Sequence, residues 1–149
     1  MADEQQSLSG PHLALAVFCE KVLIEADQVA SLIRIVDRFT VNGPSPEMTP
    51  AALNFFAVIS FKSGFIRGKH KIKIVPISPT GVELPSFEAP QLFEGEDRGA
   101  MLAAQMNFLV QEEGLYWFNV YFEEALVTRM PLRVIYQRVA FVGPAPAGG

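Results

Sequence analysis

The chain has 149 residues, half of them hydrophobic, and its formal net charge is −4. This length suits one domain that buries its core without disulfides or metals, and the composition is too apolar for a disordered protein. The acidic balance argues against a general nucleic-acid binder, and the single cysteine, Cys19, excludes an internal disulfide.

Both ends of the sequence are expected to lie outside the folded domain. Residues 1–11 lack apolar periodicity, and residues 143–149 hold only Gly, Pro and Ala. We therefore expect flexible tails at 1–11 and 137–149 around one β-sandwich domain at 12–136. The acidic start does not resemble a secretory signal and no window is long and apolar enough to span a membrane, so the cytoplasm is the expected location.

Pro and Gly recur at short intervals, and the runs between them are rich in Val, Ile and Phe, which favour strands. The first strand is expected at 12–19, and it could continue toward Ile24. The second is expected at 31–41. The third, at 53–62, is apolar on both faces and therefore predicted to be central. Short helices at 27–33 or 50–55 are the alternatives.

The clearest alternation lies at residues 69–75 and predicts a strand with one wet and one buried face. The wet face holds Lys69, Lys71 and Lys73, and the buried face holds His70, Ile72 and Ile74. A turn follows at 79–81, where Pro fixes its own φ and Gly permits a positive φ. Residues 82–93 are then expected to form one or two short edge segments broken by Pro85 and Pro90.

Residues 98–110 fit two interpretations. Their Ala, Leu, Met and Gln are good helix formers, and five apolar or amide side chains also satisfy a helical face. The same stretch has an uninterrupted apolar face at a period of two, made of Leu102, Ala104, Met106, Phe108 and Val110. We prefer a strand, because the neighbouring segments are strands.

The last part of the chain predicts a β-hairpin, with strands at 113–122 and 126–136 joined by a tight connection. In immunoglobulin-like sandwiches a Tyr opens the penultimate strand, packs its ring inward and bonds upstream backbone through its hydroxyl. Tyr116 stands at that position. The sequence therefore predicts an all-β, immunoglobulin-like antiparallel β-sandwich of about seven to nine strands.

An inward Tyr116 places a row of large side chains on the outer face of the same hairpin. At a period of two, Phe118, Val120 and Phe122 follow it inward, while Trp117, Asn119 and Tyr121 point outward. In the next strand Arg129 and Arg133 share one face, beside Trp117 and Tyr121. The candidate protein-binding residues are Trp117, Tyr121, Arg129 and Arg133.

Two explanations of this outward row stay open. A terminal segment or an oligomer partner could cover it, or it could recognise a foreign partner, since Trp, Tyr and Arg dominate interface hot spots. The arginines could also simply pair with carboxylates across strands or stack on rings without a ligand.

Positions spread over residues 13–136 carry a resemblance to a known family. They are Phe18, Cys19 and Glu20, then Ser31, Leu32, Ile33, Ile35, Val36, Asp37 and Thr40, then Gly68, His70, Ile72, Pro79 and Gly81, and finally Gly114, Tyr116, Phe118 and Val120. With these residues the chain resembles a family of small uncharacterised bacterial proteins, predicted as β-sandwiches and classed as a domain of unknown function. The resemblance implies a fold and no activity.

Residues suited to catalysis are few, so we expect the protein not to be an enzyme. A Cys19–His70 dyad would need the strands that carry them to abut, and an apolar strand does not activate a thiol. His70 is expected to be a hydrogen-bonded structural histidine. Glu94, Glu96 and Asp97 could hold calcium, but a solvated acidic loop is the simpler interpretation. We expect no cofactor, no metal and no small-molecule substrate.

A basic stripe crosses the middle of this acidic sequence. It could steer an acidic partner or nucleic acid, or it could belong to a solvated strand or to an edge strand that its lysines protect from aggregation. The stripe consists of Lys62, Arg67, Lys69, Lys71 and Lys73.

The function expected from these features is a non-enzymatic interaction module that contacts itself or a partner protein, and neither a membrane nor a nucleic acid is expected as its partner. One alternative is a structural building block of a larger phage- or defence-related assembly, joined through strand edges. The other is an enzyme that uses Cys19 and His70.

Overall fold

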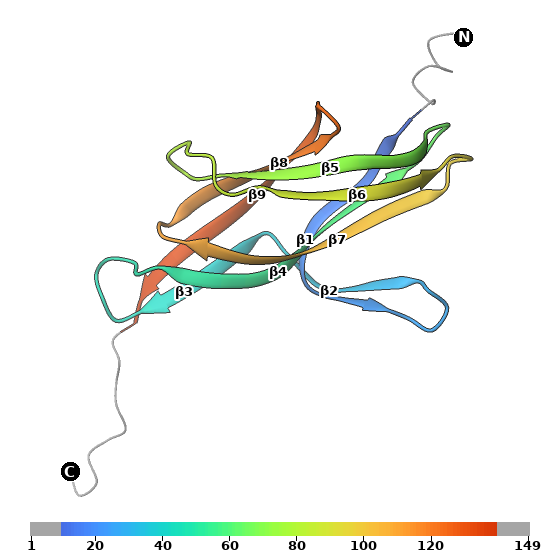
Figure 1. Ribbon diagram of the computed structural model, residues 1–149. Helices are drawn as coiled ribbons and strands as arrows, with labels where there is room; N and C mark the ends of the chain where they lie inside the picture. The colour runs from blue at the N-terminus through green and yellow to red at the C-terminus, as the bar shows by residue number, and fades with distance from the viewer. Residues whose placement is uncertain (1–9, 140–149) are drawn as a thin grey trace, which may run out of the picture.

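The computed structural model describes residues 10–139, and within this range the chain forms nine strands. The strands pack as two facing sheets (Figure 1). Among the described residues no helix is long and apolar enough to cross a membrane. The tails expected at 1–11 and 137–149 lie for the most part outside the described residues. The strands are β1 (His12–Ile24), β2 (Ala30–Val36), β3 (Arg38–Gly43), β4 (Ala51–Lys62), β5 (Arg67–Ile77), β6 (Phe87–Glu94), β7 (Gly99–Val110), β8 (Gly114–Phe122) and β9 (Ala125–Arg138).

The four-stranded sheet has the order β2-β1-β4-β7, and the five-stranded sheet has the order β3-β9-β8-β5-β6. All pairs are antiparallel except β3 with β9, which is parallel. The all-β sandwich predicted from sequence is therefore confirmed, with the correction that one of its strand pairs is parallel. β4 lies between β1 and β7, as its apolar residues on both faces predict.

The core lies between the sheets and is rich in phenylalanine. Phe118 of β8 is fully buried and packs edge-to-face on Phe18 of β1, with ring centroids 5.0 Å apart. Its ring also lies 5.1 Å from that of Phe108 in β7. Such aromatic pairs contribute about 0.5–1.5 kcal/mol each beyond the burial of apolar area. These ring contacts fix which side chains of β8 point into the core, and therefore which of them point to the outer face of the five-stranded sheet.

The strand expected at 31–41 is in fact two strands in different sheets. β2 ends at Val36 in the four-stranded sheet, and β3 begins at Arg38 in the five-stranded sheet. Asp37 makes the crossing, and its carbonyl accepts a hydrogen bond from the Arg133 amide at 3.0 Å. The prediction was wrong because residue alternation continues through the crossing and cannot reveal which sheet a strand joins.

The ambiguous segment 98–110 is a strand. β7 pairs with β4 over its whole length, from Gly99 opposite Lys62 to Val110 opposite Ala51. Its buried side chains follow the predicted period of two. The helices considered at 27–33 and 50–55 do not form, because 30–36 belongs to β2 and 51–62 belongs to β4.

The basic alternating segment, β5, is an interior strand with β8 on one side and β6 on the other. The interpretation that its lysines protect a sheet edge is therefore wrong. The edge strand next to β5 is β6. It can contain Pro90, because the outer side of an edge strand needs no hydrogen-bond donors. The turn predicted at 79–81 is present, with Gly81 at φ 91°.

Candidate functional site

The β8–β9 hairpin fixes which side chains reach the outer surface of the five-stranded sheet. Tyr116 is 1% exposed, and its hydroxyl donates a 2.6 Å hydrogen bond to the carbonyl of Glu112. This is the tyrosine corner expected from the sequence. Burial raises the pKa of the Tyr116 phenol, so the hydroxyl stays a donor. With this side chain fixed inward, its neighbour in the chain must point outward.

Trp117 lies on the outer face and is half-buried. The Arg129 guanidinium covers it, with its central carbon 4.6 Å from the ring centroid, which is a cation–π contact. The Arg129 Nε also donates to the Asn119 side-chain oxygen at 3.0 Å. The predicted alternation of β8 is therefore confirmed, and an exposed arginine lies over the ring of the tryptophan.

Arg133 occupies a different place from the one expected, because its neighbours are Leu115 and Arg38. It is four residues beyond Arg129 on β9, and among the described residues the cation–π contact with the Trp117 ring comes from Arg129 and not from Arg133. Arg38 of β3 is its register partner, so two arginines lie side by side on paired strands. A shallow groove of about 600 Å3 is lined by Asp37, Arg38, Leu115, Pro131 and Arg133.

Sequence reasoning missed Arg38, since nothing local connects it with the hairpin. Its position follows from the parallel pairing of β3 with β9, across almost a hundred residues of chain. The only usable signal was the alternation of Arg38 with Phe39, which packs against the core. That alternation predicts which face of the sheet Arg38 lies on, but it does not predict which strand pairs with β3.

Tyr121 lies at the other end of the outer row, in register with Lys73 of β5. Lys69, Lys71 and Lys73 share the outer side of β5, because Ile72 and Ile74, which alternate with the lysines, are fully buried. Lys62 of the predicted stripe does not join them, since it ends a strand of the other sheet. Arg67 begins β5 and pairs with Glu96 at 3.6 Å, while Lys71 lies 3.9 Å from Glu124 and Lys73 lies 3.7 Å from Glu88. We call the outer surface of the five-stranded sheet the basic face, defined by Trp117, Tyr121, Arg38, Lys69, Lys71, Lys73, Arg129 and Arg133.

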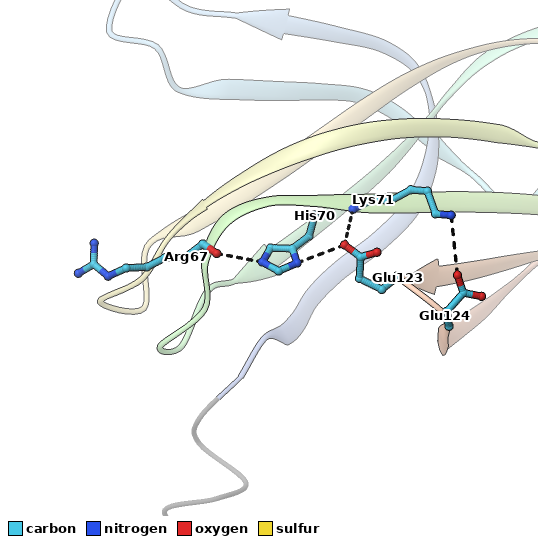
Figure 2. A network of polar contacts seen from close by, with 5 residues as sticks. All are labelled: Arg67, His70, Lys71, Glu123 and Glu124. Carbon is cyan, nitrogen blue, oxygen red and sulfur yellow. Dashed lines mark hydrogen bonds and ion pairs between the residues drawn. The ribbon is translucent and has the colours of Figure 1, made fainter.

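A hydrogen-bond network ties the tip of the β8–β9 hairpin to β5 (Figure 2). The Glu123 carboxylate accepts from the Lys71 amide at 3.0 Å and lies 3.2 Å from His70 Nδ1. His70 Nε2 is 2.9 Å from the Arg67 carbonyl. The Lys71 amide, and after it the imidazole, lowers the pKa of the Glu123 carboxyl. His70 therefore has the hydrogen-bonded structural role expected for it.

Cys19 and His70 lie in different sheets, so the structure does not bring the proposed dyad together. Cys19 is fully buried in β1, and its thiol donates to the Lys21 carbonyl at 3.4 Å. Burial raises the pKa of the Cys19 thiol, which disfavours the reactive thiolate. His70 has acceptors at both ring nitrogens, and it stacks against Phe122 with centroids 5.1 Å apart.

Arginines pair with two of the three carboxylates of the acidic loop at 94–97. Arg98 reaches Glu94 at 3.4 Å and Glu96 at 3.3 Å, and Arg67 reaches Glu96 at 3.6 Å. Within residues 10–139 no group of three or more His, Cys, Asp or Glu side chains is placed to hold a metal ion. The loop thus acts as a local ion-pair cluster.

Comparison with known proteins gives a family and a similar solved structure. A solved immunoglobulin-like protein from Pseudomonas aeruginosa is similar at 12% sequence identity and a TM-score of 0.44, covering 86% of this chain and 98% of that one. A search of the curated proteins found no match. A family model described as a family of unknown function, DUF6941, matches residues 14–135. The resemblance inferred from the sequence is thus confirmed, and the chain belongs to the DUF6941 family of unknown function.

Proposed function

We propose that the protein is a non-enzymatic interaction module and that the basic face docks a partner protein. The supporting observation is the position of Trp117, the chain's single tryptophan, on the outer side of a sheet beneath an exposed arginine. Trp, Tyr and Arg are the residues that most often dominate binding energy at protein interfaces. Here all three occur on one continuous sheet face.

The charge of the basic face argues against a second copy of the chain as its partner. Six of the twelve Lys and Arg residues lie there, and symmetric pairing would bring like charges together. A different protein is the occupant that this surface fits.

The non-enzymatic part of the proposal is supported by the state of the groups that could do chemistry. The thiol of Cys19 is buried, and both ring nitrogens of His70 are engaged by Glu123 and Arg67. General acid–base or nucleophilic catalysis needs such a group to reach a substrate. Neither is placed to do so.

The test is affinity capture from an extract of the source cells, quantified by mass spectrometry. The variant Trp117→Ala with Tyr121→Ala is compared with the wild type and with Val82→Ala plus Leu109→Ala, a control that removes exposed apolar side chains elsewhere. Loss of a hot-spot side chain costs about 2 kcal/mol or more, so specific partners should fall by about thirtyfold or more in the first variant only. An unchanged partner set in that variant would rule out the proposal.

A second candidate function, self-association, is favoured by the outer surface of the four-stranded sheet. Between Lys21 at one end and Lys62 at the other, the residues that alternate with the core-facing side chains of β1 and β4 are uncharged, and Arg34 of β2 is paired with Glu20 at 2.8 Å. Ile35 and Ile33 there are 61% and 38% exposed. The uncharged residues of this surface surround the fully buried Cys19 and Val58, and they are Leu15, Val17, Ile33, Ile35, Phe56, Ser60, Met101, Ala103 and Gln105.

We propose that a second copy of the chain covers this surface, because an uncharged sheet can face itself without like-charge repulsion. Four strands spaced by about 4.8 Å and about seven residues long give roughly 450 Å2 per copy. The total of roughly 900 Å2 is below that of a standard stable interface. The dimer should therefore be weak and dependent on concentration.

Sedimentation velocity over a range of concentrations tests self-association. The wild type should shift toward dimer as concentration rises, and Ile35→Glu should remain monomeric because it would bury a charge. Val82→Glu, which alters a similarly exposed side chain on a turn, should behave as the wild type does. A wild type that stays monomeric throughout, or an Ile35→Glu protein that dimerises equally, contradicts this candidate.

A further inference from the structure

The arginines of the molecule divide into two groups by their partners. Away from the basic face, Arg34, Arg67 and Arg98 each have a carboxylate within 4.0 Å. On the basic face, Arg38, Arg129 and Arg133 have none among the described residues. The chain has more acidic than basic residues, so acids are not scarce. Among the described residues Arg138 also lacks a carboxylate partner and donates to the Pro44 carbonyl at 3.1 Å, so three of the four arginines without a carboxylate gather on one surface.

The pairing of Arg38 with Arg133 is unfavourable in the isolated molecule. Like charges directly opposite each other on neighbouring strands are destabilising. Asp37 lines the same groove but makes no ion pair with either arginine in the part of the chain that the structure describes. A carboxylate supplied by another molecule would relieve this repulsion, and a guanidinium can bind it through two parallel hydrogen bonds.

The spacing of groups along β9 suits an extended acidic segment. Arg129 and Arg133 are four residues apart, about 13 Å in a strand, and Pro131 between them is in register with Trp117. An extended chain with carboxylates at its first and fifth residues has the same spacing. Its third residue would then lie over the apolar surface of Pro131 and Trp117.

We propose that the basic face binds an acidic, extended segment of another protein, with Arg38, Arg129 and Arg133 pairing with its carboxylates. This inference rests on the proposed function of the same face and adds the chemistry of the partner. A nucleic acid fits less well, because the whole chain carries a net charge of −4 and its overall field repels a long polyanion.

The experiment uses a short poly-L-glutamate peptide as probe. Isothermal titration calorimetry measures affinity, and the fluorescence of Trp117, the chain's single tryptophan, reports binding at this face. Arg38→Gln with Arg133→Gln should weaken binding about tenfold or more at low salt. The control, Arg34→Gln with Arg98→Gln, removes the same charge elsewhere and should stay within about twofold of the wild type. Circular dichroism confirms that all variants fold.

Three results would overturn the inference. These are the absence of saturable binding to poly-L-glutamate at low salt, an equal loss in the control variant, and a single-stranded oligonucleotide that binds as tightly as the peptide at the same salt concentration. Failure of the proposed function is distinguishable from these. If cellular partners depend on Trp117 and Tyr121 but not on the arginines, the docking face stands and only the acidic character of the partner is wrong.

Discussion

Glu123 is the residue that joins the turn of the last hairpin to the middle of the five-stranded sheet. It adopts a positive φ of 50°, a conformation that costs about 1–2 kcal/mol for a residue other than glycine. Its amide donates to the Lys71 carbonyl at 2.8 Å, and its carboxylate accepts from the Lys71 amide at 3.0 Å. These two hydrogen bonds fix the conformation of the turn and offset the strain of the positive φ.

This arrangement predicts a pH-dependent contribution of Glu123 to stability. The pKa of its carboxyl in the folded protein is lowered below the usual 4.5, chiefly by the Lys71 amide. The ionised carboxylate therefore stabilises the fold above the unfolded pKa, and this stabilisation is lost as pH falls through the folded pKa. Glu123→Gln should unfold at lower urea concentration than the wild type at neutral pH, and the two curves should converge as the pH falls below 4.5.

The neighbouring Glu124 provides the matched control. Its side chain is 95% exposed and reaches Lys71 only at 3.9 Å, so Glu124→Gln should barely move the unfolding midpoint at any pH. A constant gap between Glu123→Gln and the wild type from neutral to acid pH would contradict the role given to the carboxylate.

For single residues, the sequence predicted the side of the sheet correctly where the alternation of a strand and one residue of known orientation were sufficient. Tyr116 set the inward side of β8, and the outward position of Trp117 followed from the period of two. The stacking of Arg129 on Trp117 could be predicted from the sequence, because both residues lie in one hairpin. The position of Arg38 beside Arg133 could not be predicted, because it is determined by a long-range parallel pairing of strands.

β8 is the element on which both faces of the sheet depend. Its inward residues Tyr116, Phe118 and Val120 are at most 1% exposed, whereas the outward Trp117, Asn119 and Tyr121 are half-buried. The inward row makes the core and the outward row makes the basic face. Neighbouring residues of the same strand should therefore respond very differently to truncation.

The variants Phe118→Ala and Trp117→Ala test this difference in urea unfolding. Removing the Phe118 ring leaves a cavity among Phe18, Phe55 and Phe108 and should cost about 3–5 kcal/mol. Removing the larger Trp117 ring should cost less than half as much, because it breaks mainly the contact with Arg129. If Trp117→Ala destabilises the protein as much as Phe118→Ala, the assignment of the two faces is wrong.

The elements that sequence reasoning found are those with strict alternation or a clear turn, such as β5, β7 and the β8–β9 hairpin. It failed at Asp37, where one apparent strand divides between two sheets. Alternation is a local property, while membership of a sheet depends on partners far along the chain. For the same reason β5 looked like an edge strand and is an interior one.

On the scale of the whole molecule, the two outer surfaces of the sandwich differ in character. The four-stranded sheet presents an uncharged surface, and the five-stranded sheet presents six cations around Trp117 and Tyr121. This division separates the two contacts that we propose. Self-association uses one side of the molecule and leaves the basic face free for a partner on the other.

Site-specific photo-cross-linking in the source cells tests the docking face most directly. A photoreactive amino acid replaces Tyr121 on the basic face or Leu109, which is 54% exposed on the opposite sheet. The account predicts a discrete cross-linked partner protein from position 121 that is absent from position 109. Cross-links to the same protein from position 109 but not from position 121, or none from position 121, would contradict it.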